Sequence, residues 1–213
     1  MFEDRIDAGT QLAEKLMIFK DENVVVLAIP RGGLPLGSIV AKTLDAPLDV
    51  ALSKKIGSPF NKEYAIGAVS MENIVLSDAG RVDKKYITEE TNRIRKKLKE
   101  RQDQYYKNNS PKDLKDKIVI IVDDGIATGN TILVTVELVD MQKPAKIVVA
   151  VPVAPPSTIA KLKDSPLVDE VVCLQTPYDF QAVGQFYEEF YQVSDQEAIR
   201  LLEESNSASK SSL

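Results

Sequence analysis

The sequence predicts an α/β fold: a mainly parallel twisted sheet, helices on both faces of that sheet, and a small hood over one sheet edge. Apolar, β-branched segments of strand length alternate along the chain with segments whose apolar residues recur at helical spacing. Two of the apolar segments run directly into glycine-bearing loops that open helices, as in parallel α/β sheets. At 213 residues the chain is long enough to bury a full core.

The elements of the first half follow from apolar periodicity and from start and stop residues. Pro35 is tolerated in the first turn of its helix, Thr88 and Thr91 are candidate start signals for a long charged helix, and Ser110-Pro111 ends that helix. In chain order we expect a helix over 4–19, a strand over 24–29, a helix over 34–44, a strand over 47–52, a hairpin over 65–71 and 74–76, and a helix over 84–107.

The second half continues the alternation of strands and helices. We expect a strand over 119–122, a helix ending near 140, a strand over 146–152, a helix over 157–162, a strand over 168–174, an aromatic-rich segment over 178–191 and a helix over 195–203. Without an internal repeat or a convincing linker, residues 1–204 are predicted to form a single domain. Its hood would come from the terminal segments and the 54–110 insert. The low-complexity residues 205–213 are predicted to be disordered.

The segment 119–131, V-I-I-V-D-D-G-I-A-T-G-N-T, carries the most chemistry. A strand, a glycine-bearing turn and a helix N-terminus together favour anion binding, because unpaired N–H groups and the positive end of the helix dipole meet there. Asp123 and Asp124 stand just before that turn, and two adjacent carboxylates repel each other unless hydroxyls or a cation lie between them. The pattern therefore indicates a sugar 5-phosphate site; the alternative is an ordinary strand–turn–helix with two solvated aspartates.

This segment closely resembles the phosphoribosyl-pyrophosphate (PRPP) motif of type I phosphoribosyltransferases. Pro30-Arg31-Gly32-Gly33, which follows the first strand, is similar to the pyrophosphate loop of that family, where a non-proline cis peptide often occurs. On its own it could equally be a plain turn with an exposed arginine. Pro-Arg-Gly-Gly-Leu-Pro-Leu-Gly and Val-Gly-Gln-Phe-Tyr further resemble bacterial and archaeal members whose acceptor is unassigned.

The resemblance implies transfer of the phosphoribosyl group of PRPP to a nitrogen nucleophile, a nucleobase or related heterocycle, through an oxocarbenium-like transition state. Magnesium would be the cofactor, held mainly by PRPP, with Asp123 or Asp124 contacting it through water and no direct protein ligand assigned. The implied catalytic residues are Asp123, Asp124, Arg31 and Lys54. The implied substrate-binding residues are Arg31, Gly32, Gly33, Lys54, Lys55, Asp123, Asp124, Gly125, Ile126, Ala127, Thr128, Gly129, Asn130 and Thr131.

Some assignments stay open. Lys54, and next Lys55, would reach the pyrophosphate from a mobile loop, although a solvated lysine pair is nearly as good an interpretation. The basic stretch 93–97 is interpreted as a surface face or oligomer contact, with a lid as the alternative. Ala127 stands where hypoxanthine-guanine enzymes usually carry an aspartate base, so the resemblance does not extend to an oxopurine acceptor. A regulatory protein that binds PRPP or a nucleotide without transfer is the alternative function.

Composition narrows the function classes. A net charge of -5 disfavours nucleic-acid binding, and no apolar run approaches a membrane span. The absence of histidine excludes Ser-His, Cys-His and His-metal chemistry. The single cysteine, Cys173, favours a reducing cytoplasm. Neither G-x-G-x-x-G nor G-x-x-x-x-G-K-[ST] occurs, which disfavours other nucleotide-binding α/β enzymes. We therefore expect a cytoplasmic protein whose partners are PRPP and a small-molecule acceptor, with a homodimer as the assembly to test.

Overall fold

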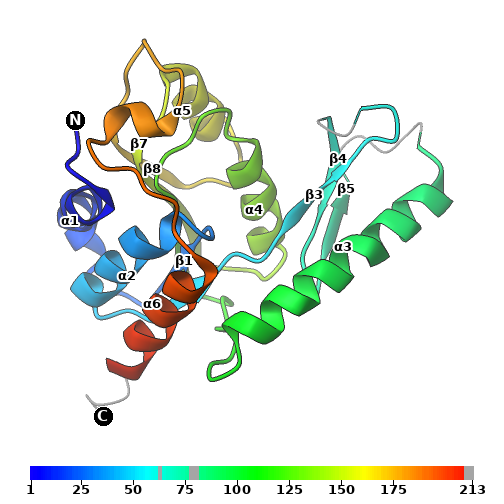
Figure 1. Cartoon of the computed structure of the whole chain (residues 1–213), viewed down its shortest axis with the longest axis horizontal. Helices are drawn as coiled ribbons and strands as arrows, with labels where there is room; N and C mark the ends of the chain where they lie inside the picture. Colours follow the sequence, from blue (N-terminus) through cyan, green and yellow to red (C-terminus); the bar gives the residue numbers. More distant parts are fainter. Residues whose placement is uncertain (62–63, 77–81, 209–213) are drawn as a thin grey trace.

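A computed structural model describes residues 1–61, 64–76 and 82–208, and its central feature is a five-stranded sheet (Figure 1). All neighbouring strands in this sheet are parallel, in the order β2-β1-β6-β7-β8. The strands are β1 (Val24–Ala28), β2 (Leu48–Val50), β6 (Ile118–Val122), β7 (Lys146–Val153) and β8 (Glu170–Gln175). The predicted fold class, a mainly parallel sheet with helices on both faces and a smaller unit beside it, is confirmed.

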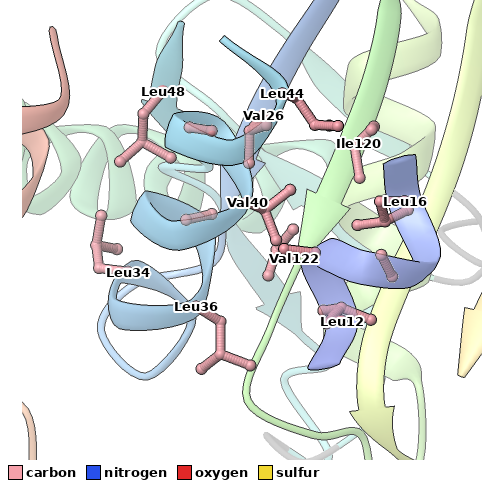
Figure 2. Close-up of a cluster of buried hydrophobic side chains, with 14 of the residues drawn as sticks. Leu12, Leu16, Val26, Leu34, Leu36, Val40, Leu44, Leu48, Ile120 and Val122 are labelled. Carbon is pink, nitrogen blue, oxygen red and sulfur yellow. The ribbon is translucent and has the colours of Figure 1, made fainter. Parts of the chain in front are cut away.

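Alternating residues of the strands build two separate cores, one on each face of the sheet. On β1 and β6, residues such as Val26 and Ile120 join the core beneath α1, α2 and α6, part of which Figure 2 shows. Their sequence neighbours, such as Val25 and Ile121, join the core beneath α4 and α5. The helices are α1 (Arg5–Lys15), α2 (Gly33–Leu44), α4 (Asn130–Asp140), α5 (Pro156–Lys163) and α6 (Asp195–Ala208). Burial on both faces explains why these strands are continuously apolar.

A second, three-stranded antiparallel sheet occupies the 54–110 region, as Figure 1 shows on the right. It consists of β3 (Lys54–Gly57), β4 (Ala65–Val69) and β5 (Ile74–Leu76), and the long helix α3 (Lys84–Tyr105) packs on it through Ile94 and Leu98. The β4–β5 hairpin was predicted, but β3 was not, because its two lysines and glycine give no strand signal. Helix α4, which packs on the main sheet, also contacts all three strands of the small sheet.

Several element boundaries differ from the prediction. The first helix ends in a 3-10 turn over Leu16–Phe19, and α3 is capped by Asp83 instead of Thr88 or Thr91. Residues 205–208, predicted to begin a disordered tail, belong to α6. There the buried side chain of Asn206 donates to the backbone oxygens of Leu48 and Leu202 (2.9 and 3.1 Å). That prediction is corrected for these four positions, and residues 209–213 lie outside the described ranges.

The start of the chain meets a segment that follows β8 at the carboxyl edge of the main sheet. Residues 178–193, which we call the strap, follow β8 and pass beside the start of α1, where Phe2 and Tyr187 form a parallel bridge. The Phe2 N–H donates to the Phe186 oxygen (2.8 Å), and the Glu188 N–H donates back to the Phe2 oxygen (2.9 Å). The ring centroids of Phe2 and Tyr187 lie 5.4 Å apart. The start of the chain and the strap therefore both contribute to the sheet edge at which parallel α/β proteins bind ligands.

Candidate functional site

The loop after β6 forms an open helix N-terminus. Among the described residues, no protein atom accepts a hydrogen bond from the backbone N–H groups of 127–131. The first hydrogen bond of helix α4 is donated by the Leu133 N–H to the Gly129 oxygen (3.0 Å). Thr128 and Thr131 are exposed at the same turn. Unpaired N–H groups at the positive end of a helix dipole, flanked by two hydroxyls, give this loop the chemistry to bind a phosphate monoester.

Gly129 sets the shape of that loop. Its backbone is left-handed (φ 75°), and a Cβ atom there would lie 3.0 Å from Cγ2 of Thr158. The Thr158 hydroxyl in turn donates to the Ala127 oxygen (2.6 Å), which fixes the loop to α5. Lys161 of α5 donates to Oδ1 of Asn130 (2.8 Å), so a cation stands beside the loop although the loop has none of its own. Neither α5 residue was predicted from the sequence.

The loop 30–33 packs directly against the two aspartates. A Cβ atom on Gly32 would lie 2.1 Å from Oδ2 of Asp124, and one on Gly33 would lie 2.6 Å from the backbone oxygen of Val122. Both positions therefore need glycine because another part of the site fills the space. The peptide bond between Pro30 and Arg31 is cis. The structure thus brings together the two loops that the sequence singled out separately.

Arg31 faces this edge but already has a partner. Its Nη1 lies 3.6 Å from Oδ2 of Asp195, the first residue of α6, and both side chains are partly exposed. Such a pair is weak in water and can be displaced by a more highly charged anion. The Arg31 side chain is therefore available to a phosphate group at the cost of one surface contact.

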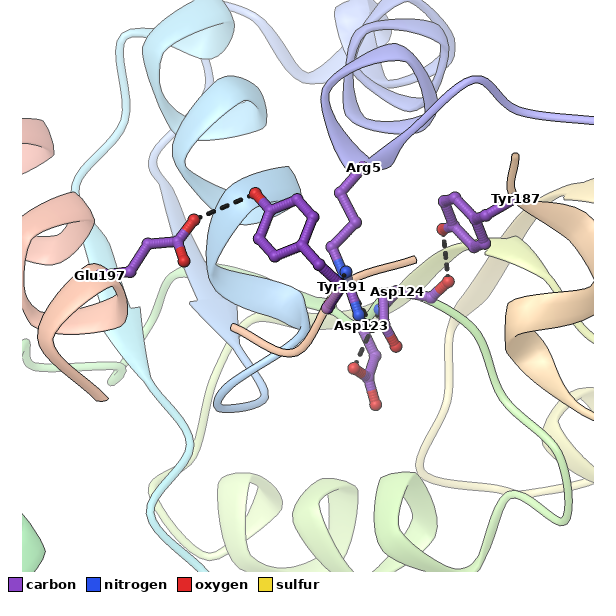
Figure 3. A network of polar contacts seen from close by, with 6 residues as sticks. All are labelled: Arg5, Asp123, Asp124, Tyr187, Tyr191 and Glu197. Atoms are coloured by element: carbon purple, nitrogen blue, oxygen red, sulfur yellow. Dashed lines mark hydrogen bonds and ion pairs between the residues drawn. The ribbon is translucent and has the colours of Figure 1, made fainter. Parts of the chain in front are cut away.

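The aspartate pair has a cation that the sequence did not indicate. Arg5, the first residue of α1, contacts Oδ2 of Asp124 through Nε (2.9 Å) and Nη2 (2.8 Å), as Figure 3 shows. The side chains of Arg5 and Asp124 are only 5% and 14% exposed. We expected a cation or hydroxyl groups to relieve the repulsion between the two carboxylates, and Arg5 of the protein itself supplies a cation to one of them.

The two carboxyl groups differ in their surroundings. Burial raises the pKa of Asp123 well above its ordinary value, and the neighbouring Asp124 carboxylate raises it further. Burial also raises the pKa of Asp124, but Arg5 opposes that shift by favouring the charged form. The Asp124 N–H donates to Oδ1 of Asp123 (2.9 Å). In Figure 3 the Asp123 side chain points away from Arg5, toward the side of the site where α4 lies. Within the part of the chain that the structure describes, Asp123 is thus the carboxyl group of the two that has no ion-pair partner.

The lysines predicted to act from a mobile loop lie on strand β3 instead. Lys54 pairs with Val69, and Lys55 pairs with Ala68. Residues that pair directly share one face of a sheet, so Lys54 lies on the face of Val69, which packs with Ile56 in the core against α3. Lys55 lies on the opposite face. Both side chains are exposed, and Lys62 and Glu63 of the same predicted loop lie outside the described residues.

Two cavities flank these elements. One of about 340 Å³ opens at the carboxyl edge and is lined by Arg5, Arg31, Gly32, Asp124 and strap residues 190–193. The other, of about 360 Å³, lies between the main sheet and the small sheet, next to the buried carboxylate of Asp49. Asp49 accepts from the Tyr106 hydroxyl (2.5 Å) and the Lys112 N–H (2.6 Å). The first cavity is lined by Arg31 and Gly32 of one loop and by Asp124 of the aspartate pair, so it is the candidate site.

Two classes of feature are not found in the described ranges. No helix there is long and apolar enough to cross a lipid bilayer. No group of three or more acidic, histidine or cysteine side chains gathers there in a way that could hold a metal ion.

Comparison with known proteins gives a consistent result. A family model described as a phosphoribosyl transferase domain matches residues 4–183. The TT1426 protein of Thermus thermophilus, known from its crystal structure, is 39% identical, with a TM-score of 0.88 over 95% of this chain and 98% of that one. A protein of Mycobacterium tuberculosis, named provisionally as a phosphoribosyl transferase, is 38% identical over 95% of this chain.

The chain spans about half the length (46%) of the curated mycobacterial relatives that it matches. A Neisseria gonorrhoeae protein solved with bound ppGpp covers 100% of this chain and 99% of its own, with a TM-score of 0.51. Its sequence is 14% identical, so this likeness concerns the fold alone.

Proposed function

Since the chain belongs to the phosphoribosyl transferase domain family, we propose that it transfers the 5-phosphoribosyl group of PRPP to a nitrogen nucleophile and releases pyrophosphate. The acceptor is a nucleobase or a related heterocycle, and the setting is the cytoplasm. The observation that carries this proposal is the packing of Gly32 against Asp124. It supports a single site in which a loop suited to pyrophosphate and a loop suited to a 5-phosphate stand on either side of two carboxyl groups.

In this proposal each part of the substrate has its own partner. The N–H groups of 127–131 and the hydroxyls of Thr128 and Thr131 bind the 5-phosphate. Asp123 accepts hydrogen bonds from the ribose hydroxyls, and Arg31 exchanges Asp195 for the pyrophosphate. The ring becomes positively charged as pyrophosphate leaves, so carboxylates fixed beside it stabilise the transition state more than the ground state.

The side chains suit a magnesium ion that the substrate brings with it. Carboxylate oxygens are ligands that magnesium prefers, but Arg5 already occupies Oδ2 of Asp124. Asp123 would therefore supply the free carboxyl group toward an ion held mainly by the substrate. When bound, magnesium supplies positive charge to the leaving pyrophosphate.

A pyrophosphate-release assay tests the proposal directly. Protein, PRPP and magnesium are incubated with a panel of purine, pyrimidine and other nitrogen heterocycles, with the Asp123→Asn variant as the matched control. We expect release that depends on one acceptor and that falls sharply in the variant. Release that is equal in both proteins, or absent with every acceptor, contradicts the transferase assignment.

The ion pair between Arg31 and Asp195 gives specific support to one alternative. An arginine held by an internal carboxylate is also what a protein that binds PRPP or a nucleotide without reaction would show, with the ligand displacing α6. Tight PRPP binding, measured by calorimetry, together with no pyrophosphate release would favour that regulatory function.

A further inference from the structure

Arg5 is buried at the site although it comes from the start of the chain. Asp4 caps α1 by accepting from the N–H groups of Ile6 and Asp7 (2.7 and 2.8 Å), and this fixes where the helix begins. Arg5 follows as the first helical residue and is 4% exposed. A guanidinium so far from water is destabilising unless its charge and its donors are matched.

The strap supplies a hydrogen-bond acceptor and an aromatic ring to the Arg5 guanidinium. Its Nη1 donates to the Tyr191 backbone oxygen (2.7 Å), and its guanidinium carbon stands 3.9 Å from the Phe190 ring centroid. The Tyr191 ring, 5.7 Å away, is held in turn by a hydrogen bond from its hydroxyl to Glu197 (3.1 Å). The guanidinium is therefore fixed in one orientation, with its fork directed at Asp124.

Asp124 is held at three points as a result. Arg5 contacts Oδ2, the backbone of Gly32 lies against that same oxygen, and the Tyr187 hydroxyl donates to the Asp124 backbone oxygen (2.6 Å). Nε and Nη2 of Arg5 both reach Oδ2, so Oδ1 lies outside the ion pair. A carboxylate held this way cannot rotate freely when a ligand arrives.

We infer that Arg5 is a positioning residue for the sugar: it fixes Oδ2 of Asp124 so that Oδ1, which lies outside the ion pair, meets the ribose hydroxyls in a set geometry. This inference rests on the proposed function. The two aspartates then have different tasks, since Asp124 is oriented by an ion pair and Asp123 has none with any described residue. An N-terminal residue and the C-terminal strap thereby take part in sugar recognition.

The test measures recognition of the hydroxyls separately from binding of the phosphate. Calorimetry compares ribose 5-phosphate with tetrahydrofurfuryl phosphate, which keeps the ring oxygen and the phosphate but lacks every ring hydroxyl. The wild-type protein should prefer ribose 5-phosphate by at least about tenfold, the effect of one hydrogen bond to a charged group. Arg5→Met should lose most of that preference while it binds tetrahydrofurfuryl phosphate as before. Arg5→Lys, which keeps the charge but not the fork, should fall between them.

Matched variants keep the test decisive. Arg200→Met removes an exposed arginine of α6 that pairs with Glu204, and this variant should change neither affinity. If Arg5→Met does not fold, Arg5→Met combined with Asp124→Asn removes both buried charges and is compared with Asp124→Asn alone, where the two should show equal, low preference. An unchanged preference in folded Arg5 variants overturns the inference and makes the ion pair purely structural. If the wild-type protein binds both phosphates equally, the inference fails while the phosphate site stands; if it binds neither, the proposed function fails as well.

Discussion

Arg5 and Asp124 form a buried ion pair across 119 positions of sequence, with Nε and Nη2 of the arginine 2.9 and 2.8 Å from the same carboxylate oxygen. The pair joins the first residue of α1 to the loop that follows β6. The pair neutralises Asp124 and does not neutralise Asp123. We therefore predict that the two neighbouring aspartates differ in their effect on stability.

Asp124→Asn should destabilise the protein, whereas Asp123→Asn should not. The first change leaves the Arg5 guanidinium buried without its counter-ion, and breaking a buried pair from one side costs about 3–5 kcal/mol. The second change removes a carboxyl group whose burial opposes ionisation. Urea unfolding at neutral pH measures both free energies of unfolding. Equal losses in the two variants would contradict this distinction.

The contribution of Asp123 to stability should fall as pH rises from acid toward neutral, and Asp123→Asn should remove that contribution. The pKa of Asp123 is raised in the folded protein by burial and by Asp124. Between the pKa values of Asp123 in the unfolded and folded states, the folded state therefore binds more protons than the unfolded state. The stability that protonated Asp123 contributes is complete below the unfolded-state pKa and is lost as pH rises through the folded-state pKa. Unfolding free energies across that range measure the slope. Parallel curves for wild type and variant would show that Asp123 does not titrate as described.

Gly129→Val should abolish binding of ribose 5-phosphate, and Gly129→Ala should weaken it less. The left-handed backbone at Gly129 costs an ordinary residue roughly 1–2 kcal/mol, and any Cβ would meet Thr158 at 3.0 Å. The two methyl groups of valine add crowding that the loop cannot absorb without moving its N–H groups. Calorimetry measures affinity, and circular dichroism confirms that each variant is folded. Wild-type affinity in the folded valine variant would place the phosphate elsewhere, for example on Arg31.

Lys55→Ala should lower turnover more than Lys54→Ala does. The strand register places Lys54 on the face that packs against α3 and Lys55 on the opposite face. The sequence favoured Lys54 as the residue that reaches the pyrophosphate. The two variants each remove one exposed lysine from β3, so each serves as the control for the other. Steady-state pyrophosphate release measures turnover, and ribose 5-phosphate binding should stay unchanged in both because that ligand lacks pyrophosphate. A larger loss of turnover in Lys54→Ala would return the role to that residue.

The sequence by itself determined the parts of this protein that depend on local pattern. Continuous β-branched runs such as 118–122 indicated strands buried on both faces, and the double-aspartate loop indicated a sugar-phosphate site and its family. The periodicity of buried residues and the residue types of turns extend over a few neighbouring positions, so both can be recognised in the sequence without a structure. The strand β3 was missed because its lysines and glycine pair only in the presence of β4.

Tertiary structure alone decided which distant groups meet. Nothing near Arg5 marks it as the partner of Asp124, since a lone arginine at a helix start resembles any exposed cation until the strap buries it. The same holds for Thr158 beside Gly129 and for Asp195 beside Arg31. These contacts join segments whose separation in sequence carries no periodic signal, and their strength depends on burial, which only packing determines. The sequence therefore identified the chemistry of the site, and the fold determined which carboxylate stays free to use it.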